Sequence, residues 1–285
     1  MDTMQHLYSI VDENFIQDVD DTSPEFAKLV EEFLEYETER LGFPHGQKPD
    51  YILSYCPYCK SITFNAVELD DRYPETCYLC RESDPYFKIG KSIEKAKYLY
   101  NLILKDEIST EKPEYFKRII LEQIIVILAT GLELFLRDIY STTLNHRFIK
   151  DDKSMFERFF QDSRNKFTNL NSAKGLFSKD LGINLGSMEG QGFKKLKLLM
   201  VSRNAIVHNI GLADVHYIDQ SELEIEPKTP IPIQIEDISE YILLLERLAI
   251  DINNKLGMEL WQEKIKRFEV YVKDGLNEYK DIRHK

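Results

Sequence analysis

The sequence predicts a mainly α-helical protein with a small β-rich module near its N-terminus and one β-hairpin near its C-terminus. Only 12 glycines and 10 prolines occur among the 285 residues, whereas all-β folds need many turn residues. Apolar residues recur at spacings of three or four over long stretches, as on the buried face of a helix. Hydrophobic residues make up 43% and charged residues 30%, and this balance excludes wholesale disorder.

The composition and the pattern divide the chain into four parts. The first helix starts at Ser23-Pro24-Glu25, because a hydroxyl cap, a proline and an acid all favour a helix N-terminus. The predicted parts are an acidic arm with this helix, a β-rich module, a helical domain and a C-terminal helix: residues 1–49, 50–90, 91–257 and 258–285.

The longest periodic stretch runs from Pro113 to about Ile149 and predicts the central helix of the helical domain. Its flanking positions are also apolar, so the helix should be buried over most of its circumference. The residues that recur at spacings of three or four are Ile120, Ile124, Leu128, Leu132, Phe135 and Ile139. Further helices are expected over residues 92–108, 153–170, 193–209 and 236–256, and a loop with one short turn over 171–191.

The pattern changes to period two after Gly211. Residues 223–226 and 231–235 alternate around a Pro-Lys-Thr-Pro turn, which predicts a small hairpin. Pro230 and Pro232 confine its second strand to an edge, because proline cannot donate to a ladder.

No membrane or secretory segment is expected. The longest wholly apolar run, residues 124–129, is far shorter than a membrane span needs. The first residues carry no basic region and no apolar core, so they do not form a secretory signal. We therefore expect a soluble, cytoplasmic protein.

Charge is distributed unevenly along the chain. Lys and Arg number 37 against 49 Asp and Glu, a net charge of −12. Residues 1–90 hold 7 basic and 19 acidic residues, whereas residues 137–210 hold 13 basic and 7 acidic residues. The acidic total argues against non-specific coating of nucleic acid, but the basic segment could line an RNA-binding groove. The acidic N-terminal region could contact a regulatory protein.

All four cysteines lie in two CxxC pairs separated by 17 residues: Cys56, Cys59, Cys77 and Cys80. This spacing predicts a four-thiolate Zn²⁺ site of the closed, structural kind. The alternating segment 61–67 between the pairs is typical of a zinc-ribbon strand. Two roles of the site remain open: a metal that only stabilises a short segment, or a recognition surface. If the module is a recognition surface, the acidic residues around the cysteines favour a protein as its partner.

The predicted helix 193–209 carries Arg203 near its C-terminal end. At about 100° per residue, apolar side chains flank the guanidinium: Leu196, Leu199, Met200 and Val207. A buried guanidinium without a partner costs free energy. Arg203 should therefore meet a carboxylate, a phosphate or another subunit.

The neighbouring face of the same helix carries a row at spacings of three and four: Lys194, Lys197, Val201, Asn204 and His208. This set suits phosphodiester chemistry, because imidazole moves protons near neutral pH and guanidinium holds phosphate oxygens. The alternative is a histidine that merely caps the helix C-terminus, where a positive charge is favoured.

The sequence Arg203-Asn204-x3-His208 resembles the signature of HEPN-domain ribonucleases. A long, apolar, glutamate-bearing helix precedes it, as in that superfamily. The continuation His208-Asn209-x-Gly211-x2-Asp214-x2-Tyr217 is similar to many HEPN proteins of bacterial defence and toxin systems. The resemblance covers about residues 91–257 and implies a HEPN-like helical bundle. Some members carry a modified tyrosine two residues after the histidine, where this chain has Ile210.

The resemblance implies a metal-independent endoribonuclease that acts as a homodimer, with two motifs facing each other in a shared cleft. Attack of the 2′-hydroxyl on the adjacent phosphate leaves a 2′,3′-cyclic phosphate and a 5′-hydroxyl. At matching positions, His208 is the general acid or base, Arg203 clamps the phosphate, and Asn204 orients the phosphate or the histidine. No catalytic metal is expected.

Four further residues complete the candidate site. Glu133 could pair with Arg203 or with Arg137 four residues on, and Arg137 is slightly favoured. The candidate RNA-binding residues are Lys194, Lys197 and Asn209. Two other functions remain open: a catalytically inactive HEPN and zinc-ribbon dimer that acts as a scaffold or sensor, and a zinc-ribbon transcriptional regulator. The second is weaker, because the ribbon is acidic and no helix-turn-helix pattern stands out.

Overall fold

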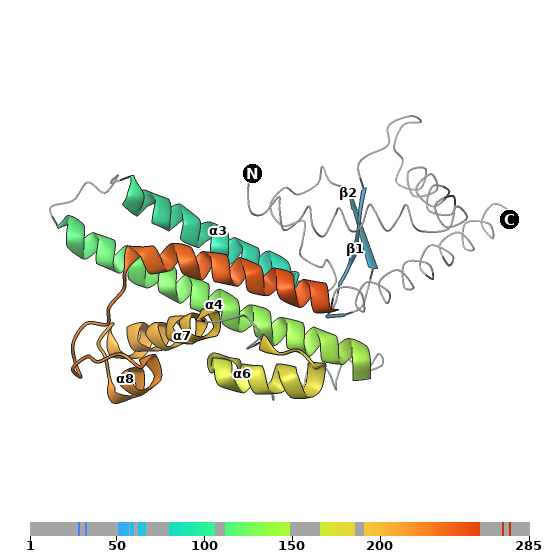
Figure 1. Ribbon diagram of the computed structural model, residues 1–285. Helices are drawn as coiled ribbons and strands as arrows, with labels where there is room; N and C mark the ends of the chain where they lie inside the picture. Colours follow the sequence, from blue (N-terminus) through green and yellow to red (C-terminus); the bar gives the residue numbers. More distant parts are fainter. Residues whose placement is uncertain are drawn as a thin grey trace, which may run out of the picture. The chain divides into compact units, whose positions relative to one another are not determined.

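The structure is a computed structural model that describes part of the chain. The described residues are Lys28, Glu32, 51–56, 58–59, 62–66, 80–105, 112–148, 166–185, 191–256, 270 and 274. They are mainly helical (Figure 1), which confirms the predicted class. The chain divides into two compact units, one of residues 1–84 and 256–285 and one of residues 85–255.

The first unit contains an antiparallel pair of strands, β1 (Tyr51–Tyr55) and β2 (Ile62–Ala66). Tyr51 lies opposite Ala66 and Tyr55 opposite Ile62. β2 falls within the alternating segment 61–67, so the period-two pattern there is that of a strand. Most of the predicted arm (1–49) and of the C-terminal helix (258–285) lies outside the described residues; Lys28, Glu32, Val270 and Asp274 are helical.

The second unit is built on two long helices, α3 (Pro85–Leu104) and α4 (Pro113–Phe148), which pack along each other (Figure 1). Each begins with a proline, whose missing N–H costs nothing at the first helical position. α3 therefore starts before the predicted residue 92, within the segment assigned to the β-rich module. The predicted apolar stripe of α4 is buried along its whole length: Ile120, Ile124, Leu128, Leu132, Phe135 and Ile139.

Two small residues let α3 and α4 approach closely. A Cβ atom added at Gly131 of α4 would lie 2.7 Å from both Cβ and Oγ of Ser92 on α3. Two turns along α4 from Gly131, Asp138 is fully buried and accepts a hydrogen bond of 2.8 Å from Lys88 of α3. Arg137 donates to the other carboxylate oxygen at 3.0 Å. The helix pair is thus fixed by both packing and charge.

By length and composition, α4 could also cross a membrane. The wholly apolar run at 124–129 is much shorter than this helix, because Thr130, Gly131 and Glu133 interrupt it without making the helix polar. Half of the apolar stretch is buried inside the protein. A core helix that is covered from several sides needs the same composition as a membrane helix.

Four shorter elements follow α4: η2 (Lys166–Thr168), α6 (Leu170–Leu176), the π-helix η3 (Phe177–Leu181) and α7 (Gly192–Asn209). The loop predicted over 171–191 is therefore wrong for its first half. Asn169 caps α6 by accepting hydrogen bonds from the backbone N–H groups of Asn171 and Ser172. Phe167 and Phe177 pack against Tyr140 of α4, and this aromatic cluster holds the segment in place.

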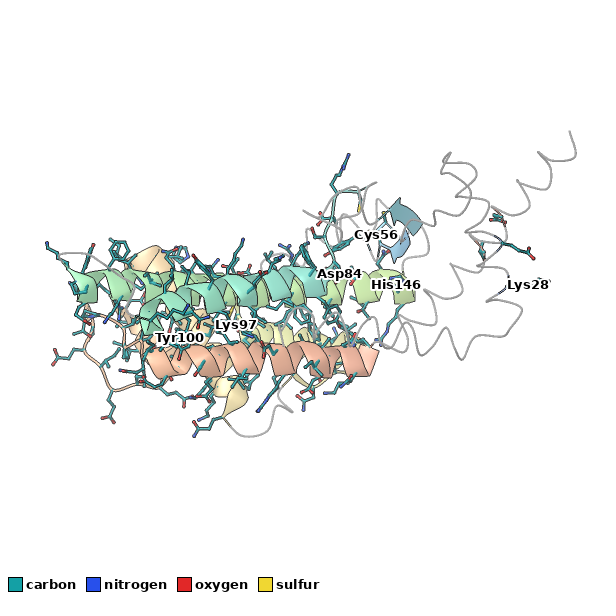
Figure 2. The ribbon with its side chains drawn as sticks, turned by 90° about the horizontal axis from the view of Figure 1, so that it is seen from above. Lys28, Cys56, Asp84, Lys97, Tyr100 and His146 are labelled. Carbon is teal, nitrogen blue, oxygen red and sulfur yellow. The ribbon has the colours of Figure 1, made fainter. Side chains whose placement is uncertain are left out.

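The last described part contains α8 (Val215–Ser221) and a long helix over residues 235–256, drawn orange-red in Figure 1. Ion pairs tie this helix to α3 and α7. Lys97 of α3, labelled in Figure 2, contacts Glu246 at 2.8 Å, and Lys195 of α7 contacts Glu240. The predicted helix over 236–256 is confirmed.

The hairpin predicted over residues 223–235 is wrong, since residues 223–234 are described and lie in no strand. The turn and the second arm pair instead with the chain after α7. Lys228 N of the turn donates to Ala213 O at 2.7 Å, and Ile231 N of the second arm donates to Gly211 O at 2.9 Å. The alternating apolar residues pack on a cluster between α7 and α8. The alternation of apolar residues in this segment therefore reflects burial of one side of a loop and not the hydrogen-bond ladder of two strands. The cluster consists of Val201, Ala205, Ala213, Tyr217 and Ile231.

Candidate functional site

Three of the four cysteines lie together in the first unit. Cys56 and Cys59 stand between β1 and β2, and Cys80 precedes α3. Their Sγ atoms lie within 4.8 Å of one another, and those of Cys56 and Cys80 are 3.5 Å apart. Sulfurs bound to one tetrahedral ion at about 2.3 Å stand about 3.8 Å apart, whereas disulfide sulfurs are about 2.05 Å apart. The three cysteines are close enough to hold a metal ion. Cys77 lies outside the described residues.

Burial strongly raises the pKa of the Cys56 thiol, because the thiolate is poorly solvated there. A bound cation reverses this preference, since a coordinating thiol is deprotonated by the ion's charge. The chemistry of the cluster therefore fits a metal site better than a reactive free thiol.

The second unit has an open pocket of about 320 Å³ at the C-terminal end of α7. Four predicted site residues line it together, namely Arg203, Asn204, His208 and Asn209. The remaining lining comes from α7, from the start of α8 and from η2: Val201, Ala205, Asp214, His216, Tyr217 and Thr168. The residues of the Arg203-Asn204-x3-His208 motif thus line one pocket.

Arg203 makes two polar contacts within the fold. Its Nη1 donates a hydrogen bond of 2.9 Å to Asn204 Oδ1, and its Nη2 lies 3.7 Å from Glu133 Oε2 of α4. The carboxylate partner expected for this arginine is therefore Glu133. The slight preference for a Glu133–Arg137 pair was wrong, because Arg137 contacts Asp138 instead.

The hydrogen bonding of this ion pair is incomplete. Arg203 Nε and Glu133 Oε2 are buried, and neither has a hydrogen-bond partner among the described residues. Buried polar atoms without partners are rare in proteins, and a guanidinium with unused donors can still bind an oxyanion. The arginine is therefore held in position without being saturated.

His208 is exposed at the rim of the pocket, in the last turn of α7. The next residue has a structural contact: Asn209 Nδ2 donates to Asp214 Oδ2 at 2.5 Å. Asp214 Oδ1 accepts from the backbone N–H of Tyr217 at 2.7 Å and so caps α8. These two hydrogen bonds, with the backbone bond the larger cause, lower the pKa of Asp214. Asn209 and Asp214 thus fix α8 against the end of α7.

The two candidate RNA-binding lysines do not line the pocket. Lys194 lies at the opposite end of α7 and pairs with Glu222 at 3.2 Å. Lys197 is half-buried one turn further on. Of the predicted row on α7, only Val201, Asn204 and His208 reach the pocket. Part of the basic charge between residues 137 and 210 is also balanced locally by acids.

Sequence reasoning missed His216, Asp214 and Thr168 as pocket residues. His216 belongs to no motif in the sequence, but it lies in the first turn of α8 and lines the pocket. The signal that could have revealed this is Asp214, an acid just before Val215-His216-Tyr217, since Asp is a preferred helix cap. Comparisons of the chain with protein-family models, with curated proteins and with solved structures find no match.

Proposed function

We propose that this protein is a metal-independent endoribonuclease of HEPN type, with its active site in the α7 pocket. The observation that carries the proposal is the common lining of the pocket by Arg203, Asn204 and His208. The helical unit supports it, because a HEPN-like bundle requires long helices packed around one that carries the motif. Glu133, on the long apolar helix before the motif, contacts the arginine.

The proposed reaction is transfer of the RNA phosphate to the neighbouring 2′-hydroxyl. The 2′-oxygen attacks phosphorus as its proton leaves, the bond from phosphorus to the 5′-oxygen breaks, and that oxygen takes up a proton. The products are a 2′,3′-cyclic phosphate and a 5′-hydroxyl. His208 would move a proton, and Arg203 would bind the phosphate oxygens as negative charge develops. Asn204 would position Arg203 through their hydrogen bond.

The resemblance to defence and toxin proteins suggests the biological setting. We propose a prokaryotic anti-phage or toxin effector that is cytoplasmic, works as a homodimer and cuts RNA when activated. Its acidic N-terminal region would bind a regulatory protein. We further propose that the cysteine cluster holds structural Zn²⁺, with Cys77 as the fourth ligand, and that it takes no part in the reaction.

The second candidate is a catalytically inactive dimer of the same fold that acts as a scaffold or sensor. One observation favours it: Glu133 and Asn204 already contact the guanidinium of Arg203. An arginine that is largely neutralised within the fold can serve structure alone.

The test is cleavage of a labelled RNA pool without magnesium by the wild type, His208→Ala and the control Val207→Ala. Val207 is 50% exposed on the same turn and does not line the pocket. A chelator is avoided, because it could remove the metal from the cysteine cluster. Cyclic-phosphate ends should form with the wild type and control, and His208→Ala should be slower by about 10²–10⁴. RNA binding without cleavage by all three proteins would favour the scaffold.

A further inference from the structure

The α7 pocket contains a second imidazole, which the motif does not include. His216 comes from the first turn of α8 and lines the same pocket as His208 and Arg203. Like His208, it is exposed, so its side chain serves no purpose in the core. Two imidazoles from different helices beside one arginine are the groups that a phosphodiester transfer needs.

The attachment of α8 explains how His216 is held at the pocket. Asp214 caps α8 through Tyr217 N and is itself bound by Asn209, the residue after His208. Tyr217 is buried in the cluster between α7 and α8. Each histidine is thus adjacent to a residue of this connected set. The two imidazoles are therefore attached to one hydrogen-bonded corner between α7 and α8.

The charges at the pocket indicate why one arginine would not suffice for an anion. Arg203 has Glu133 at 3.7 Å, and Asp214 adds a second negative charge to the lining. While both imidazoles are neutral, these two carboxylates outweigh the guanidinium. One protonated imidazole, a form that histidine adopts near neutral pH, offsets this excess of negative charge, and a second one reverses it. Phosphate binding at this site therefore requires the histidines as well as the arginine.

We propose that His216 is a second catalytic residue and shares one bound phosphodiester with His208 of the same chain. This inference rests on the proposed ribonuclease activity. One imidazole accepts the proton of the 2′-hydroxyl as the 2′-oxygen bonds to phosphorus. The other donates a proton to the 5′-oxygen as its bond to phosphorus breaks. The proton count is balanced without a metal ion, and both proton-transfer groups come from one chain, so a homodimer would hold two such sites.

The first test measures binding, so that it is independent of cleavage. The imidazole resonances of the full chain are followed by NMR during titration with inorganic phosphate, near pH 6. Those of His208 and His216 should shift together with one dissociation constant, and both shifts should be lost in Arg203→Gln. A shift of His208 alone would overturn the inference even if RNA is cleaved. Joint shifts without RNA cleavage by the wild type would instead contradict the proposed ribonuclease.

The second test separates the two proton transfers. His208→Ala and His216→Ala should each slow cleavage of a dinucleotide by about 10²–10⁴, whereas Val215→Ala, an exposed neighbour on α8 outside the pocket lining, should not. A substrate with sulfur in place of the 5′-oxygen has a leaving group that needs no acid. It should restore the rate of one histidine variant and not of the other. Restoration of neither, or of both equally, would contradict a division of roles.

The third test asks whether the two imidazoles act within one chain. His208→Ala and His216→Ala are mixed, allowed to exchange subunits and assayed. A site within one chain is damaged in every subunit, so the mixture should stay as slow as its components. Recovery of cleavage in the mixture, well above the rate of either component, would show a site shared between chains and would overturn the assignment.

Discussion

The two units of this chain are stabilised by different means. The described part of the first unit has two five-residue strands and a cluster of three cysteines. The second unit has long helices around a continuous apolar core. Two five-residue strands alone bury too little surface to offset the conformational entropy of the segment, so the metal ion of the proposed Zn²⁺ site would add stability there that the second unit obtains from its core. Each unit should therefore fail under a treatment that leaves the other intact.

The largest effect should follow loss of the metal. Cys56→Ser should abolish stoichiometric metal binding and unfold the first unit, since structural Zn²⁺ sites contribute about 10–16 kcal/mol to folding. Metal content by mass spectrometry and limited proteolysis measure the two effects. The exposed neighbour substitution Glu82→Gln serves as control. Retention of one metal ion per chain by Cys56→Ser would show that this sulfur is not a ligand.

The helical unit should respond to its core in the same way that the first unit responds to its metal. Leu128→Ala should lower the free energy of unfolding of this unit by about 2–5 kcal/mol, because a fully buried leucine leaves a cavity. Denaturant titration followed by circular dichroism measures it, and metal content should stay unchanged. Loss of metal in this variant would mean that the two units do not fold independently.

The close approach of α3 and α4 should give a smaller effect. Gly131→Ala should destabilise by about 1–3 kcal/mol through overpacking against Ser92, which outweighs the gain in helix propensity of about 1 kcal/mol. The double variant Gly131→Ala with Ser92→Gly should recover stability in denaturant titrations. An additive double variant would contradict the proposed contact.

Removal of the α8 cap should cost about 1 kcal/mol. The lowered pKa of Asp214 means that the folded state favours the carboxylate, so its contribution is present above the ordinary pKa of aspartate. This contribution declines as the pH falls through the lowered pKa. Asp214→Ala should therefore destabilise at neutral pH and converge with the wild type in acid. Thermal unfolding across pH tests this; a constant difference at all pH values would exclude the linkage.

The smallest effect should be a gain. Ile210 ends α7 in the left-handed conformation, with φ of 55°, and is 90% exposed. Ile210→Gly should stabilise the helical unit by about 0.5 kcal/mol, because the relief of left-handed strain is partly offset by the greater entropy of glycine in the unfolded chain. Gly211→Ala is the opposite control, since its Cβ would lie 2.8 Å from Glu122 Oε1. A loss of stability in Ile210→Gly would indicate a contact made by the isoleucine.

The sequence predicted those features that depend on one element alone. The buried stripe of α4 follows from its 3.6-residue period, and the cysteine cluster follows from its spacing. The hairpin at 223–235 failed because alternation is also produced by a loop that buries one side on other helices. Glu133 was assigned to Arg137 because residues four apart on a helix are neighbours. Arg137 contacts the adjacent Asp138 instead, and the tertiary fold brings Arg203 of α7 to Glu133.

The site was predicted only in part for the same reason. Arg203, Asn204 and His208 lie within six residues of one helix, so their proximity can be deduced from helix geometry. His216 reaches the pocket only through the turn after α7 and the docking of α8. A single histidine carries no spacing signal, and no local rule connects it with a residue on another helix.

The buried charge pair between α3 and α4 has a consequence for how the two helices recognise each other. Because an apolar stripe repeats every turn, sliding one helix by about 5.4 Å along the other would preserve much of the apolar contact between them. Such a slip would separate Lys88 from the fully buried Asp138 and Ser92 from Gly131. The ion pair and the contact at Gly131 together specify how α3 and α4 are aligned along their axes.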